Sequence, residues 1–412
     1  MRALNAISPR GFSMIELMVA MLIGLIGMII IFQVFEVSEG IKRTTTSGGD
    51  AQQNGAVALY VIERDLRNAG AGFNDTPTAG CPIVGSDSMR ATPNFPPLGT
   101  QMLLVPATIT STVVPTDPDQ LTIFYGSKPN VVNATTLTTP MGIPTDNLTV
   151  RNPYGYKPGD LILLQDPGTV SPCSIMEVTG TPSSTPPTVA PVNVARSTNS
   201  YALISGVAKT PRFNPAGGLG VTYNGTAANT TRVFNLGNIH EPAGSPDLPV
   251  HNTYAIVNRS LQVTSLFVPN SASASPQVNT VADNIVHMRV LYGVDTGPVF
   301  NAAGDGDGIV DSYVNAATFN AMVVNGFIPP WRYVLAVRVA VVARSALAEK
   351  PSEGAAGCDA TTDGTEAPPG PDRRPKWSGG IFNLTADPDW KCYRYRVFET
   401  TVPLRNWIWR SS

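Results

Sequence analysis

A long apolar stretch opens the hydrophobic pattern of this chain. From Phe12 to Phe35 nearly every side chain is apolar, and the only ionisable one is Glu16. A run of more than about 18 apolar residues is long enough to cross a bilayer as a helix. A charge inside such a span costs at least a few kcal/mol, so Glu16 needs a positively charged partner and marks a candidate functional site.

A second helical pattern follows the apolar stretch. The chain first turns polar, and the adjacent Gly48 and Gly49 predict a bend or break, because each glycine destabilises a helix by roughly 1 kcal/mol relative to alanine. Apolar residues then recur at spacings of three and four until the helix ends at Gly70-Ala71-Gly72. The residues on this face are Gly55, Leu59, Ile62, Leu66 and Ala69.

Beyond Cys81 the pattern becomes that of strands, with short apolar runs between turn residues. The segment 254–263 predicts a hairpin that turns near Asn258. Residues 332–344 alternate most clearly, with arginines on one face and apolar residues on the other. Residues 285–292 alternate in the same way.

The last strand pattern, 392–405, shifts phase near Glu399, which predicts a β-bulge. Only 14 % of the residues are charged, whereas glycine and proline number 37 each, a balance typical of turn-rich β structure. The sequence therefore predicts an α+β fold, with one long N-terminal helix packed on a large, mainly antiparallel β head.

A short basic leader, residues 1–11, precedes the apolar stretch and carries Arg2 and Arg10 but no acid. Basic residues before a first hydrophobic segment hold that end in the cytoplasm. In a secretory signal peptide the small-residue cleavage site follows the apolar region, whereas here Gly11 precedes it. Cleavage after Gly11 would leave the whole apolar helix on the mature protein.

The segment from Arg10 to Val19, RGFSMIELMV, resembles the class III signal of type IV pilins and type II secretion pseudopilins. This resemblance implies that a prepilin peptidase cleaves after Gly11 and N-methylates Phe12 as the new N-terminus. It also implies that the Glu16 carboxylate meets the terminal amine of a neighbouring subunit in the filament. A charge-assisted partner of this kind makes a buried acid tolerable.

Four further segments resemble minor pilins of the PilW family, namely residues 54–73, 291–295, 337–345 and 395–406. They cover both ends of the chain well and roughly 76–252 poorly, so that stretch is a candidate added subdomain or set of large loops. The predicted organisation is a leader at 1–11, a transmembrane and filament-core helix at 12–36, an amphipathic helix half at 37–70, and a head at 71–412 whose PilW-like part is 253–412.

Four cysteines, Cys81, Cys173, Cys358 and Cys392, all follow the apolar span, and none forms a CxxC motif. An even number on the exported side favours two disulfides, for which three connectivities are open. We favour Cys81–Cys173 and Cys358–Cys392, because each of these pairs closes the shorter loop. The second pair resembles the C-terminal disulfide loop of many pilins.

An acidic loop at 304–311, GDGDGIVD, is a candidate calcium site, since calcium prefers several oxygen ligands from a tight loop. Its match to an EF-hand loop is incomplete, because Ala303 falls on the first ligand position and no acid stands at the twelfth. The candidate ligands are Asp305, Asp307 and Asp311, with Asp295 folding back to fill the gap. The alternative is a metal-free Asp/Gly turn.

Other functional classes find little support in the sequence. The net charge is −2 and no basic tract indicates nucleic-acid binding. Only three histidines are present, and no motif places a catalytic metal, nucleophile or phosphate. We therefore expect no enzyme, and no cofactor apart from calcium.

The resemblance implies a minor pilin that takes part in priming and assembling type IV pili near the pilus tip and supports twitching motility, adhesion or DNA uptake. Its expected partners are other minor pilins and the major pilin, prepilin peptidase, the inner-membrane assembly platform and a tip adhesin. We expect a single-pass inner-membrane protein with a periplasmic head that later enters the extracellular pilus. Two alternatives stay open: a GspJ-like minor pseudopilin of type II secretion, and a pilus-borne adhesin whose head binds a surface or host ligand.

Overall fold

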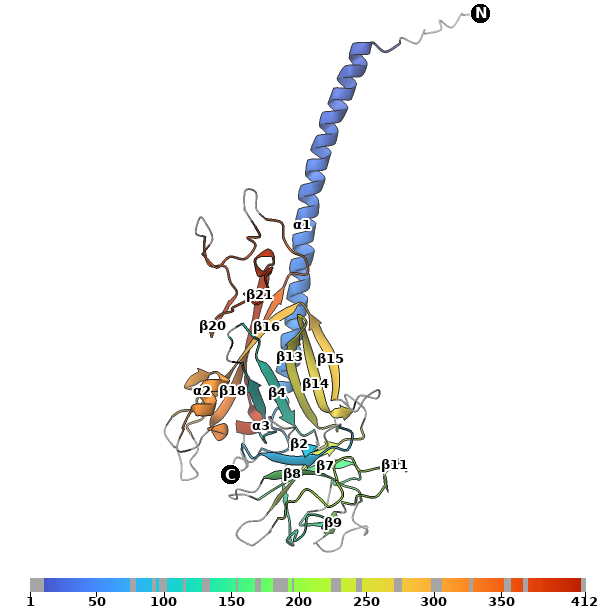
Figure 1. Cartoon of the computed structure of the whole chain (residues 1–412), viewed down its shortest axis with the longest axis vertical. Coiled ribbons are helices and arrows are strands. Elements are labelled where there is room, and N and C mark those ends of the chain that lie inside the picture. The colour runs from blue at the N-terminus through green and yellow to red at the C-terminus, as the bar shows by residue number, and fades with distance from the viewer. Residues whose placement is uncertain are drawn as a thin grey trace, which may run out of the picture.

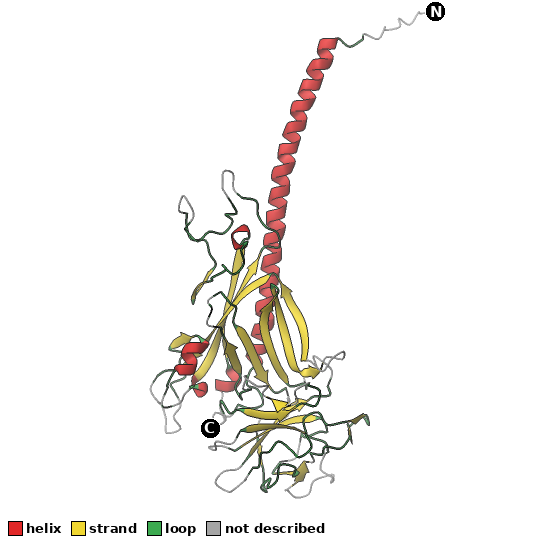
Figure 2. Cartoon of the chain, in the orientation of Figure 1, coloured by secondary structure: helices red, strands yellow, loops and turns green. Residues whose placement is uncertain are grey.

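A computed structural model gives the architecture of the chain (Figures 1 and 2). It describes residues 11–74, 79–90, 94–95, 102–112, 114, 116–127, 134–152, 155–166, 172–180, 192–194, 196–223, 231–241, 247–269, 276–297, 306–324, 326, 329–351, 357–365 and 370–408. The predicted α+β fold is confirmed: one long N-terminal helix joins a head built mainly of antiparallel strands.

Helix α1 runs without interruption from Met14 to Asn68, and its N-terminal part projects beyond the head (Figure 1). The predicted bend or break at Gly48 and Gly49 is therefore wrong. Ser47 and Ala51 are both buried against the head, so the glycine pair is held between two contacts. These contacts and the helical turns on both sides offset the low propensity of two glycines.

Two antiparallel sheets hold the C-terminal half of α1. The four-stranded sheet has the order β17–β16–β18–β21, and the five-stranded sheet has the order β15–β14–β13–β4–β3. The strands of the first are Ser312–Val314, Ile285–Val294, Val334–Arg344 and Tyr395–Pro403. Those of the second are Pro276–Asp283, Ser260–Pro269, Val250–Val257, Gln120–Tyr125 and Ala107–Thr110.

The buried face of α1 contributes Ala58, Ile62 and Leu66 to one large hydrophobic core shared with both sheets. The same face of α1 also carries a buried acid, Asp65. Its Oδ2 accepts hydrogen bonds from the Tyr254 hydroxyl at 2.6 Å and from the Asn252 amide at 2.8 Å, both on β13. These bonds satisfy the buried carboxylate and fix the rotation of α1 on the five-stranded sheet.

A third sheet lies at the end of the molecule farthest from the N-terminus (Figure 1). Its order is β2–β1–β8–β7–β12–β5, and only the β1–β8 pair is parallel. The strands are Asn94–Phe95, Ile83–Ser86, Cys173–Glu177, Asp160–Gln165, Arg232–Asn238 and Thr135–Thr136. The sheet buries a second apolar cluster that includes Ile162, Met176 and Val233.

Residues 76–252 thus divide between two sheets. They supply every strand of the six-stranded sheet, and they also supply β3 and β4 of the five-stranded sheet, where β4 pairs with β13. This stretch, which the family resemblance covers poorly, is therefore joined to the rest of the head by a shared sheet.

Short elements complete the described fold. Strand pairs β6–β9 (Leu148–Val150 and Val192–Val194), β10–β11 (Tyr201–Ala202 and Ala208–Lys209) and β19–β20 (Lys376–Trp377 and Gly380–Ile381) form small ribbons. The short helices are α2 (Ala316–Ala321), η2 (Trp331–Tyr333), η3 (Trp390–Cys392) and α3 (Arg405–Ile408).

The predicted hairpin is confirmed: β13 and β14 pair through a tight turn at Asn258 and Arg259. Both residues have positive φ, 50° and 64°, which is the backbone of a two-residue turn between twisted strands.

The bulge predicted near Glu399 is wrong, because β18 and β21 pair in an unbroken register from Ala336–Pro403 to Arg344–Tyr395. The apolar pattern changes phase for another reason. Phe398 packs into the core beside α1, while Val397 packs into a separate cluster with Phe382 and Trp390 on the opposite face. Both faces of β21 are covered, so its hydrophobic residues do not alternate.

Two disulfides, Cys81–Cys173 and Cys358–Cys392, join the four cysteines in the favoured pairing. Their Cα atoms lie 5.9 and 4.7 Å apart. The first ties the start of the head to β8, and the second ties the 357–365 segment to η3 just before β21.

Candidate functional site

The apolar half of α1 is exposed along its whole length. From Phe12 to Phe35 its large hydrophobic side chains are between about half and nine-tenths accessible, with Phe12 at 82 % and Ile26 at 48 %. Exposed apolar surface of this extent on a protein marks a membrane or protein interaction site. The helix is also long and apolar enough to cross a membrane.

Glu16 lies in the first turn of α1, where the Ser13 side chain caps the helix by accepting the Ile15 N–H at 3.3 Å. A carboxylate is favoured here because the helix N-terminus carries partial positive charge. In the part of the chain that the structure describes, no ion pair includes Glu16. The residue is therefore placed to receive a cation from outside the subunit, and its pairing with a neighbour's amine stays a prediction.

Gly11 and Phe12 precede the helix in extended or irregular backbone, and both are exposed. A Cβ at Gly11 would meet nothing within 4 Å, so the junction is sterically open. Residues 1–10 of the predicted leader lie outside the described residues. Cleavage after Gly11 and methylation of Phe12 stay predictions.

The acidic loop brings three of its four predicted residues together beside β16. Asp295 is buried and accepts the N–H groups of Gly297 at 3.1 Å and Gly308 at 2.8 Å. Asp307 lies close by, since a Cβ on Gly297 would stand 3.3 Å from an oxygen of each carboxylate. Asp311 accepts the N–H of Thr296 at 2.7 Å.

Asp305, the fourth candidate, lies outside the described residues. Among the residues that are described, no group of three or more His, Cys, Asp or Glu side chains has the arrangement of a metal site. Backbone N–H groups already bond to both Asp295 oxygens, so the loop has a way to satisfy this acid without a cation. Calcium binding stays a prediction.

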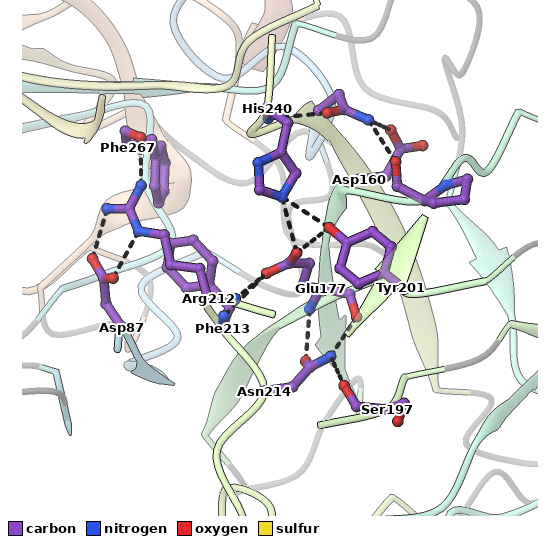
Figure 3. Close-up of polar contacts among 12 residues, drawn as sticks. Asp87, Asp160, Glu177, Ser197, Tyr201, Arg212, Phe213, Asn214, His240 and Phe267 are labelled. Atoms are coloured by element: carbon purple, nitrogen blue, oxygen red, sulfur yellow. Dashed lines mark hydrogen bonds and ion pairs between the residues drawn. The ribbon is translucent and has the colours of Figure 1, made fainter. Parts of the chain in front are cut away.

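A buried polar cluster in the six-stranded sheet escaped sequence reasoning (Figure 3). Glu177, at the end of β8, is fully buried and accepts hydrogen bonds from the Tyr201 hydroxyl and from the backbone N–H of Arg212 at 2.6 Å. The Nε2 atom of His240 lies 3.2 Å from Glu177 and 2.8 Å from the Tyr201 hydroxyl. Burial, followed by the Glu177 charge, raises the pKa of Tyr201, which keeps its hydroxyl protonated as a donor.

The same cluster extends to a buried ion pair. The guanidinium of Arg212 donates two hydrogen bonds of 2.7 Å to the carboxylate of Asp87 and one of 2.7 Å to the carbonyl of Phe267 on β14 (Figure 3). Arg212 lies 125 positions from Asp87 and 55 from Phe267, and no local pattern marks these residues. The cluster links loops of the six-stranded sheet to the five-stranded sheet, and its carboxylates are occupied by these structural bonds.

Two parts of the chain match known protein families. Residues 8–32 match the prokaryotic N-terminal methylation motif, and this span contains Gly11, Phe12 and Glu16. With the exposed apolar helix, the match supports a type IV pilus-related pilin and is consistent with membrane anchoring and incorporation into a pilus.

Residues 252–406 match the family of Type IV Pilus-assembly protein W, PilW. This match and the N-terminal motif together support a type IV pilin similar to the PilW family, as the sequence resemblance predicted. The matches leave residues 33–251 uncovered. Searches of curated proteins and of solved structures returned no match at the threshold applied.

Proposed function

We propose that the chain is a minor pilin that takes part in priming and assembling type IV pili near the tip. The observation that carries this proposal is the exposed helix from Phe12 to Phe35, which holds a single acid and whose apolar side chains are left exposed by the described residues of the head. Lipid covers such a surface before assembly, and neighbouring pilin helices cover it afterwards.

The mechanism is association rather than catalysis. Prepilin peptidase removes the leader after Gly11, and the methylated amine of Phe12 becomes the positive group of each subunit. Glu16 pairs with the amine of a neighbour as the helix leaves the inner membrane at the assembly platform. The head, periplasmic until then, passes to the exterior with the filament, together with other minor pilins, the major pilin and a tip adhesin.

This mechanism is tested in a strain whose own gene is deleted and that expresses the Glu16→Ala variant from a second copy. We expect surface pili and twitching motility to fall, because the apolar helix loses its charged docking group, while the cellular amount of protein stays unchanged. Glu39→Gln is the matched control, since this exposed acid on the same helix lies beyond the apolar run. Wild-type piliation of the Glu16→Ala strain would remove the assembly role.

Processing has a separate readout. Gly11→Ala should leave the leader uncleaved, so the protein migrates as the larger precursor on a gel. Complete cleavage of this variant would contradict the assignment of Gly11.

The alternative of a GspJ-like pseudopilin predicts a different loss. In that case, Glu16→Ala abolishes secretion of type II substrates and leaves motility intact. Measuring both phenotypes in one strain separates the two systems.

A further inference from the structure

A cavity of about 420 Å³ lies on the face of the five-stranded sheet that points away from α1. The direction follows from β13, where Asn252 and Tyr254 bond to Asp65 of α1 and His251 and Thr253 alternate with them. Small-molecule sites in proteins have volumes of roughly 300–1,000 Å³. The cavity therefore has room for a small ligand, and neither the helix nor the acidic loop contributes to it.

Hydroxyl and amide groups form one part of the cavity lining. On the sheet, Thr108 is the register partner of Thr122, and Thr122 is the partner of Thr253, so three neighbouring strands present a row of threonines. The Thr122 and Thr253 hydroxyls lie 2.9 Å apart. A hydroxyl can both donate and accept, so this row suits a ligand that carries several hydroxyls. The polar lining comprises Thr108, Thr110, Gln120, Thr122, Thr253 and Asn320.

Aromatic rings supply a second part of the lining. Phe124, Tyr292 and Trp331 all border the cavity, and the Tyr292 and Trp331 rings meet edge to face with centroids 5.7 Å apart. Such rings give a rigid apolar surface beside the polar row. Apolar walls with a few convergent polar groups are the usual composition of a ligand site.

One cation stands in the cavity. Arg90 lines it, and within the described residues the Arg90 guanidinium has neither an ion pair nor a hydrogen bond. Burial, with a smaller contribution from the nearby Arg90 charge, lowers the pKa of His251 to about 4, so His251 is neutral at pH 7. Among the described lining residues, Arg90 then supplies the one positive charge, which favours an anionic group.

We propose that this cavity binds an acidic sugar, with its carboxylate on Arg90 and its hydroxyls on the threonine row. Arginine binds a carboxylate through two parallel N–H donors, which a neutral sugar does not exploit. A simple carboxylate, in turn, leaves the threonine row unused. The ligand class is a uronic acid unit of a surface polysaccharide, and this binding role goes beyond the proposed role in assembly.

Calorimetric titration of the detergent-solubilised full-length protein tests the proposal with four probes: glucuronic acid, galacturonic acid, glucose and acetate. We expect at least one of the two acids to bind, and both glucose and acetate to bind at least about tenfold more weakly. Glucose binding as tightly as the acids would overturn the role of Arg90. Acetate binding as tightly would overturn the assignment to a sugar, and heats absent for all four would overturn the site.

Two variants test the residues independently. Arg90→Gln should reduce affinity for the acidic sugar to that for glucose, and Thr253→Val should weaken both, with circular dichroism confirming that each variant folds. Matched controls are Arg151→Gln and Thr280→Val, which change exposed residues outside the cavity. Unchanged sugar affinity in both Arg90→Gln and Thr253→Val would overturn the proposal.

Discussion

A buried histidine gives this head a sensitivity to acid. His287 lies on β16 with 1 % of its surface accessible, and its ring stands edge to face against Phe382 at a centroid distance of 5.3 Å. Its Nε2 atom is buried and has no hydrogen-bond partner among the residues that the structure describes. Burial, followed by the charge of Arg289, lowers the pKa of His287 to about 4.

The sign of the pH effect follows from this lowered pKa. Between about pH 6.5 and pH 4 the unfolded chain binds a proton at this histidine and the folded chain does not. The free energy of unfolding therefore decreases as the pH is lowered through this range. His287→Gln removes the group and should make that loss smaller by roughly 3 kcal/mol. Urea unfolding of both proteins at pH 7 and pH 4 measures it. Equal losses in the two proteins would contradict a neutral buried His287.

Asp307 provides the test of calcium at the acidic loop. If calcium binds, titration into the full-length protein should release heat, and Asp307→Ala should abolish that heat by removing one of the clustered carboxylates. Asp283→Ala is the control, because this exposed acid lies on β15, outside the loop. An unaltered protein that gives no calcium-dependent heat would leave the loop as a metal-free turn.

At the scale of elements, Gly55 of α1 lies against Phe398 of β21. A Cβ at this position would overlap the ring of Phe398, so the contact requires a glycine. Gly55→Ala should lower the free energy of unfolding by roughly 1–3 kcal/mol, the usual cost of overpacking a core. Gly48→Ala is the control and should stabilise the helix by roughly 1 kcal/mol, since a Cβ there meets nothing within 4 Å.

Gly55 and Gly48 also show which features of helix α1 can be predicted from the sequence. The periodic face that includes Gly55 predicts the helix and its buried side, because spacing alone determines which residues share a face. Whether Gly48 and Gly49 break the helix depends on contacts at Ser47 and Ala51, which local propensity does not report. In the same way, the pattern around Glu399 reflects apolar side chains packed on both faces of β21 and not a change of register.

The candidate sites also differ in whether the sequence alone reveals them. Gly11, Phe12 and Glu16 are recognisable because their order and spacing form one continuous motif. The cluster around Glu177 and the cavity beside Arg90 combine residues from distant segments, so they emerge only once the sheets are assembled.

At the scale of the whole molecule, the buried Arg212 connects the six-stranded sheet to β14. Its guanidinium donates hydrogen bonds to Asp87, which follows β1, and to the carbonyl of Phe267 on β14. Arg212→Met leaves the Asp87 charge buried without its partner, which costs roughly 3–5 kcal/mol. We expect amide hydrogens of β7 and β12 to exchange faster while those of β16 and β18 keep their protection. Adding Asp87→Asn removes the stranded charge and should restore part of the protection, whereas the exposed Arg151→Gln should change nothing. Uniformly faster exchange in all three sheets would show instead that the head unfolds as one cooperative unit.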